Sequence, residues 1–126
     1  FRSLEIERKT KILERYRAGL ADTSLRFPLA TEGAQPAWHL CVVVAPNEKD
    51  RDALRAHLAS RQVDTLVHYP NPLHLQPAFR LAIPSSLPKA ESLAKRILSL
   101  PFSANHTEEE IDFVIQCVND WHQSGD

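Results

Sequence analysis

Residues 38–44 read Trp38-His39-Leu40-Cys41-Val42-Val43-Val44 and form the clearest strand pattern in the chain. The run is apolar, continuous and rich in β-branched side chains, which is typical of a strand in the middle of a sheet. Pro46 and Asn47 end it. We therefore predict a central strand here and derive the remaining elements outward from it.

Helices and further strands are predicted on both sides of this strand. Asn47 is placed to cap a helix, and Thr107 with Glu110 forms a capping box that starts another. The expected helices cover residues 1–20, 47–61, 89–96 and 107 onward, and the expected additional strands cover 24–29, 63–69 and, at an edge of the sheet, 97–102. This order predicts an α+β domain with a small, largely antiparallel sheet covered by helices.

Apolar side chains recur at helical spacing in the first and last helices, which predicts that one face of each is buried. The expected core residues of these two helices are Leu4, Ile12, Leu13, Tyr16, Leu20, Ile111, Val114, Ile115, Val118 and Trp121.

The composition describes one soluble domain. The chain has 126 residues, 43% of them hydrophobic, with 15 basic and 16 acidic residues and a net charge of −1. This balance provides no electrostatic attraction to nucleic acid or to an anionic membrane surface, and no apolar run is long enough to cross a bilayer. We expect a cytoplasmic protein whose two cysteines, Cys41 and Cys117, are reduced. The sequence contains no methionine, and Phe1 already lies inside a helical pattern. We therefore also expect the chain to be a piece of a longer protein.

The run from His68 to Gln76 (His-Tyr-Pro-Asn-Pro-Leu-His-Leu-Gln) is the candidate binding segment. Its two prolines restrict the backbone, so we expect Tyr69 and Asn71 to be extended. A stiff polar segment directly after a strand suits ligand binding, because little entropy is lost when the ligand arrives. The same pattern also fits a proline-rich crossover loop whose histidines are only solvated.

A complete catalytic set is missing from the sequence. The spacing of the six histidines matches no standard metal site, and neither a GxSxG nor a CxxC motif is present. Three glycines are too few for a phosphate-binding loop. The five lysines, Lys9, Lys11, Lys49, Lys89 and Lys95, lie on polar helix faces, where a Schiff-base amine is not desolvated.

Several of these segments together resemble the DegT/DnrJ/EryC1/StrS family of PLP-dependent nucleotide-sugar aminotransferases. The resemblance rests on strand 38–43, on the run His68-Tyr69-Pro70-Asn71-Pro72-Leu73-His74-Leu75-Gln76-Pro77-Ala78, on Leu98-Ser99-Leu100-Pro101 and on Thr107-Glu108-Glu109-Glu110-Ile111. It covers nearly the whole chain and implies only the C-terminal small domain of fold type I aminotransferases, with residues 1–20 as a connecting helix and 21–126 as the domain.

The resemblance implies a role and a set of ligands. His68, Tyr69, His74 and Gln76 would bind substrate, a nucleotide-linked keto-deoxysugar used in cell-surface polysaccharide or glycoside biosynthesis. Pyridoxal phosphate and its lysine would belong to a separate large domain of a homodimeric parent, with glutamate as the amino donor. The chain alone would bind no cofactor and have no activity.

Three departures from the family pattern accompany the resemblance. Gln62 stands where the family often has glycine, Phe79 where tyrosine is common, and Asn105-His106 where a turn usually contains proline. An alternative also stays open: a non-enzymatic α+β module for ligand sensing or oligomerisation has the same strands and helices.

Overall fold

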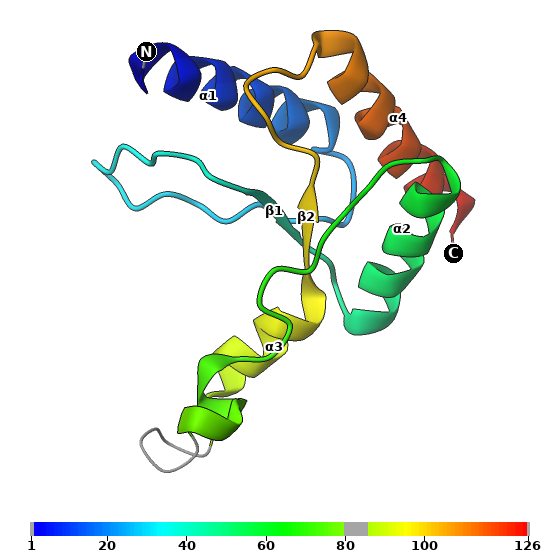
Figure 1. Ribbon diagram of the computed structural model, residues 1–126. Coiled ribbons are helices and arrows are strands. Elements are labelled where there is room, and N and C mark those ends of the chain that lie inside the picture. Colours follow the sequence, from blue (N-terminus) through cyan, green and yellow to red (C-terminus); the bar gives the residue numbers. More distant parts are fainter. Residues whose placement is uncertain (1, 80–85, 126) are drawn as a thin grey trace.

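A computed structural model describes residues 2–79 and 86–125 of the chain (Figure 1). Its elements are α1 (Arg2–Gly19), β1 (Cys41–Val44), α2 (Glu48–Ser60), the short 3-10 helices η1 (Leu73–Leu75) and η2 (Pro77–Phe79), α3 (Pro88–Arg96), β2 (Ile97–Leu100) and α4 (Glu108–Ser124). The predicted α+β class, a small antiparallel sheet with helices packed on it, is confirmed. Phe1, the predicted helix start, lies outside the described residues.

The sheet is built on an antiparallel pair, β1 and β2, in which Cys41 lies opposite Leu100 and Val44 opposite Ile97. On the outer side of β1, Val44 forms a single antiparallel bridge with Arg26. On the outer side of β2, Ser99 forms a single antiparallel bridge with Leu66. The order across the sheet is therefore residue 26, β1, β2, residue 66. The sheet itself has only the two strands β1 and β2, and each has a single bridging residue on its outer side, so the strand predicted to be central and the strand predicted to be at the edge occupy equivalent positions.

The strands predicted over 24–29 and 63–69 were too long, since each contributes only one bridge. In the first, Pro28 has no N–H to donate and Leu29 is 88% exposed, so the chain leaves the sheet after Arg26. In the second, the N–H of Val63 bonds to the carbonyl of Leu58 in α2, which keeps the start of the segment out of the ladder.

One face of the sheet carries the core. Cys41, Val43, Leu98 and Leu100 are buried on the side covered by α1, α2 and α4, while α3 lies at one end, away from α1 and α4 (Figure 1). Burial raises the pKa of the Cys41 thiol to about 12. The alternate residues Val42 and Val44 are only half-buried, so the described chain leaves the second face partly open.

Helix α1 is fixed to the core by close packing and hydrogen bonds. The Tyr16 hydroxyl donates to the carbonyl of Pro101 at 2.9 Å, and the Asn119 side chain donates to the carbonyl of Gly19 at 3.0 Å. A Cβ on Gly19 would lie 2.7 Å from the Ile115 side chain, so a larger residue at this position would force that side chain to shift. Leu4, predicted to be buried, is 61% exposed because the first turns of α1 extend past the sheet (Figure 1).

Both predicted helix caps are present, and the end of α2 explains one departure from the family pattern. Asn47 accepts a hydrogen bond from the N–H of Asp50, and the Thr107–Glu110 capping box is complete. After α2, Gln62 has a φ of 60°, in the left-handed region that favours glycine. Its N–H bonds to the carbonyl of Ala59, which together with the Val63–Leu58 bond forms a Schellman motif.

We predict that Gln62→Gly stabilises the fold, because glycine adopts the left-handed conformation without the steric penalty of a Cβ. The gain in the free energy of unfolding should be about 1 kcal/mol, measured by urea denaturation. Gln62→Ala is the matched control and should give no gain, because alanine keeps the Cβ. Equal stabilisation by both variants would show that backbone strain at this position is not the cause.

Candidate functional site

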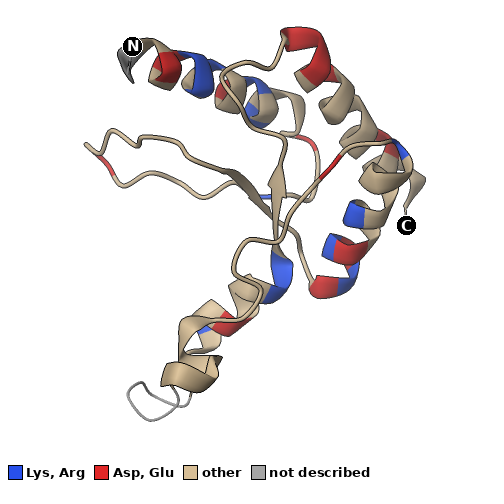
Figure 2. Ribbon diagram, in the orientation of Figure 1, with Lys and Arg blue, Asp and Glu red and all other residues tan. Residues whose placement is uncertain are grey.

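The segment from Thr65 to Phe79 carries no charged side chain, although charges cover the helices around it (Figure 2). It begins at the Leu66–Ser99 bridge on the edge of the sheet and ends with the turns η1 and η2 beside α3. Its polar groups are imidazole, phenol and amide, which suit neutral hydrogen-bonding partners better than phosphate or carboxylate.

His68 lies over the open face of the sheet. Its ring is half-buried, and Nδ1 lies 2.8 Å from the hydroxyl oxygen of Ser99. Ser99 shares a face with its opposite neighbours Val42 and Leu66, the face away from the helical core. The sheet therefore determines where the imidazole stands.

Tyr69 adopts an unexpected backbone conformation. Its φ is 59°, so the prediction that it is extended is wrong, even though Pro70 follows it. The conformation turns the chain away from the sheet and leaves the phenol 81% exposed, with its ring centroid 6.5 Å from that of His68. His68 and Tyr69 thus form a neighbouring pair of accessible hydrogen-bonding groups.

His74 and Gln76 are instead engaged within the chain. The buried His74 ring places Nε2 2.9 Å from an oxygen of Glu91, and that same oxygen accepts the N–H of Leu87 at the start of α3. The Gln76 side chain donates to the carbonyl of Asn71 at 3.3 Å. These contacts fasten the segment to α3 and to itself, and substrate binding by either residue stays a prediction.

A small apolar cavity of about 280 Å³ lies between this segment and α3. Tyr69 and His74 line it from one side, and Leu87 and Leu93 from the other, with Ile97 from the sheet. Leu93 is 43% exposed because it faces this open cavity. The cavity provides an apolar surface next to Tyr69.

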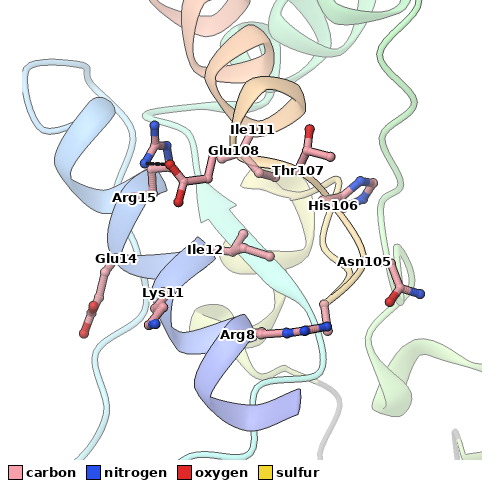
Figure 3. Close-up of a pocket in the computed structure, with 11 residues that line it drawn as sticks. Arg8, Lys11, Ile12, Glu14, Arg15, Asn105, His106, Thr107, Glu108 and Ile111 are labelled. Atoms are coloured by element: carbon pink, nitrogen blue, oxygen red, sulfur yellow. Dashed lines mark ion pairs between the residues drawn. The ribbon is translucent and has the colours of Figure 1, made fainter. Parts of the chain in front are cut away.

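Sequence reasoning missed a second cavity, of about 580 Å³, between α1 and the start of α4 (Figure 3). Arg15 spans this seam, with ion pairs to Glu108 at 3.0 Å and to Asp112 at 2.6 Å. All three side chains are substantially exposed, so these pairs contribute little stability. The dense charge of α1 opposite the acidic first turn of α4 was the signal available in the sequence.

The lysines of this chain do not have the surroundings of a lysine that forms a Schiff base with pyridoxal phosphate. Lys11, Lys49, Lys89 and Lys95 are exposed, and Lys9 pairs with Glu5 at 2.8 Å. None of these amines is desolvated in the way a Schiff-base lysine requires. Among the described residues, three or more metal-ligating side chains do not come together, and no helix has the length and apolar character needed to cross a membrane.

The model of the DegT/DnrJ/EryC1/StrS aminotransferase family matches residues 3–119. The chain belongs to this family. The match includes all four stretches on which the predicted resemblance rested, among them the segment from His68 to Gln76 and the run from Leu98 to Pro101.

Two curated proteins to which this chain is similar are a transaminase and a protein named for sensory transduction. The dTDP-3-amino-3,4,6-trideoxy-alpha-D-glucose transaminase of Streptomyces venezuelae is 38% identical over 122 residues, which is 94% of this chain and 31% of that protein. The erythromycin biosynthesis sensory transduction protein EryC1 of Saccharopolyspora erythraea is 41% identical over 111 residues, 86% of this chain and 30% of that protein.

A solved structure shows the same fold. The crystal structure of DesV from S. venezuelae matches with a TM-score of 0.86 at 38% identity, over 94% of this chain and 32% of that chain. This chain thus spans about a third of the length of its curated relatives. The predicted family and fold class are confirmed.

We predict that Glu91→Gln loosens the attachment of the binding segment to α3. Bonding to His74, and then to the N–H of Leu87, lowers the pKa of Glu91 from its ordinary value of 4.5. A carboxyl with a lowered pKa stabilises the fold above its ordinary pKa, and the contribution disappears as pH falls through the lowered value. The variant should therefore melt a few degrees below wild type at pH 7.

That difference should shrink as the pH falls below 4.5, measured by thermal unfolding at a series of pH values. Glu14→Gln, on an exposed face of α1, is the matched control and should change the melting temperature little. A Glu91→Gln deficit that is constant down to the lowest pH would contradict the assigned charge interaction.

Proposed function

We propose that this chain is the small domain of a PLP-dependent aminotransferase that transfers an amino group to a nucleotide-linked keto-deoxysugar. Residues 1–20 would be the connecting helix and 21–126 the domain. The proposal is carried by the family match over residues 3–119, and the 38% identity to a dTDP-amino-sugar transaminase supports the substrate class.

The neighbouring pair of half-buried His68 and exposed Tyr69 is the proposed contact with the sugar. An imidazole N–H and a phenol hydroxyl donate to and accept from hydroxyl and carbonyl oxygens, and the surrounding segment lacks charges that would favour a different ligand. The adjoining apolar cavity suits the methyl group of a deoxysugar. His74 and Gln76 would contribute by holding the segment in place, with direct contact as a lesser role.

The rest of the reaction lies outside this chain. Pyridoxal phosphate would supply the amino-transfer chemistry from a large domain, with glutamate as the donor, in a cytoplasmic homodimer that serves polysaccharide or glycoside biosynthesis. This chain's own part would be to close one side of the cleft, orient the sugar and exclude water, which accelerates a reaction through proximity.

A ligand-sensing role is the second candidate, and one observation favours it. The 41% identical relative EryC1 is named as a sensory transduction protein. In that case the same open face and the same histidine would bind a sugar nucleotide without turnover. Transamination by the gene product that contains this chain distinguishes the two functions.

We predict that His68→Ala in that gene product raises KM for a dTDP-linked keto-sugar by about tenfold, because one hydrogen bond to the bound sugar is lost. KM for glutamate should change little, whereas the melting temperature should fall because the buried Ser99 hydroxyl loses its partner. His122→Ala, an exposed histidine on α4, is the control and should behave as wild type. Steady-state transamination kinetics are measured for wild type, His68→Ala and His122→Ala. The 126-residue chain alone serves as the blank.

An unchanged KM for the sugar, with only a lower melting temperature, would show that His68 is a packing residue. Turnover by the chain alone would contradict the assignment of the cofactor to a separate large domain.

A further inference from the structure

Ser99 is the one hydroxyl-bearing residue in β1 and β2, and it is 5% exposed. Its neighbours Leu98 and Leu100 face the helical core, so Ser99 faces the opposite side, beneath His68. A buried serine between two core leucines costs free energy unless its hydroxyl is hydrogen-bonded. The contact with His68 Nδ1 at 2.8 Å meets this requirement.

The direction of this hydrogen bond follows from the other groups around Ser99. Its backbone N–H donates to the carbonyl of Leu66 at 2.8 Å, and its carbonyl accepts from the N–H of Leu66 at 3.3 Å, so both backbone groups are occupied. Among the described residues, Nδ1 of His68 is the acceptor within reach of the hydroxyl. The hydroxyl proton is satisfied only when Ser99 donates and Nδ1 accepts.

The neutral ring then carries its proton on Nε2. Within the described part of the chain Nε2 has no hydrogen-bond partner, and it is not among the buried polar atoms that lack one. The N–H therefore faces solvent over the open side of the sheet, next to the exposed Tyr69. An uncharged donor in a segment without lysine or arginine suits a neutral oxygen acceptor of a sugar better than a phosphate.

We propose that Ser99 is a positioning residue: it fixes the tautomer and orientation of His68 so that Nε2–H donates to an oxygen of the bound sugar. The ligand part rests on the proposed function of His68, whereas the Ser99–His68 pairing rests on geometry alone. Each half has its own experiment.

The pairing is tested by long-range ¹H–¹⁵N NMR on the 126-residue chain with ¹⁵N-labelled histidine, at about pH 8.5, where histidine is neutral. In wild type, His68 should show a pyridine-type Nδ1, shifted by accepting a hydrogen bond, and a protonated Nε2. In the Ser99→Ala variant, the ¹⁵N chemical shift of His68 Nδ1 should move to the value of a nitrogen that accepts no hydrogen bond. Ser99→Cys, similar in shape but a weak donor, should resemble Ser99→Ala.

A protonated Nδ1 on His68 in wild type would overturn the proposal. So would identical His68 signals in wild type and Ser99→Ala. Backbone amide spectra of the variants establish that each is folded before its ring is interpreted.

The ligand part is tested by kinetics of the complete gene product. Ser99→Ala should raise KM for a dTDP-linked keto-sugar by about threefold to tenfold, and Ser99→Thr should restore most of the loss because the hydroxyl returns. If Ser99 acts through His68, the Ser99→Ala/His68→Ala double variant should be no worse than His68→Ala. A purely structural serine would instead give additive losses, and that result would overturn the proposal.

The two experiments separate the possible failures. If the His68→Ala variant has the same KM for the sugar as wild type, both the proposed function of His68 and the ligand part of this inference are refuted. If His68→Ala raises KM for the sugar but Ser99→Ala does not, the proposed function of His68 stands and the role of Ser99 is refuted.

Discussion

The placement of β2 between β1 and residue 66 is the constraint on which the other features depend. Each residue of the run Leu98-Ser99-Leu100-Pro101 makes a separate contact. The two leucines enter the core, the carbonyl of Pro101 accepts the buried hydroxyl of Tyr16 from α1, and Ser99 contacts His68. One short strand thereby connects the helical core on one face with the candidate site on the other.

Elements with local signals were predictable from the sequence. The helix started by Asn47 and the capping box of Thr107 and Glu110 follow from side chains within four residues of the groups they bond. Strand lengths were not predictable, because a segment such as 63–69 has β-type alternation whether or not a partner strand continues beside it. The bond from the N–H of Val63 to α2 belongs to the local Schellman motif, whose usual sequence signature, a glycine at the left-handed position, is missing here because Gln62 stands there.

For the candidate site, too, the residues within one segment were predictable and the long-range contacts were not. The composition of the segment from His68 to Gln76 marked it for binding, and the structure leaves His68 and Tyr69 accessible. The contact between His74 and Glu91 joins residues 17 apart, and that between His68 and Ser99 joins residues 31 apart. A lone serine in an apolar strand gives no indication of its partner, so its role emerges only once the register places it under the imidazole.

Hydrogen exchange of the backbone amides most directly tests the claim that β2 positions the binding segment. The account predicts that the amides of Leu66 and Ser99, which bond to each other's carbonyls, exchange as slowly as the amide of Val44, which donates to the carbonyl of Arg26 on the other side of the sheet. Exchange of Leu66 and Ser99 as fast as that of the exposed turn at Gly33 would contradict it. That result would mean that the segment carrying His68 moves independently of the sheet.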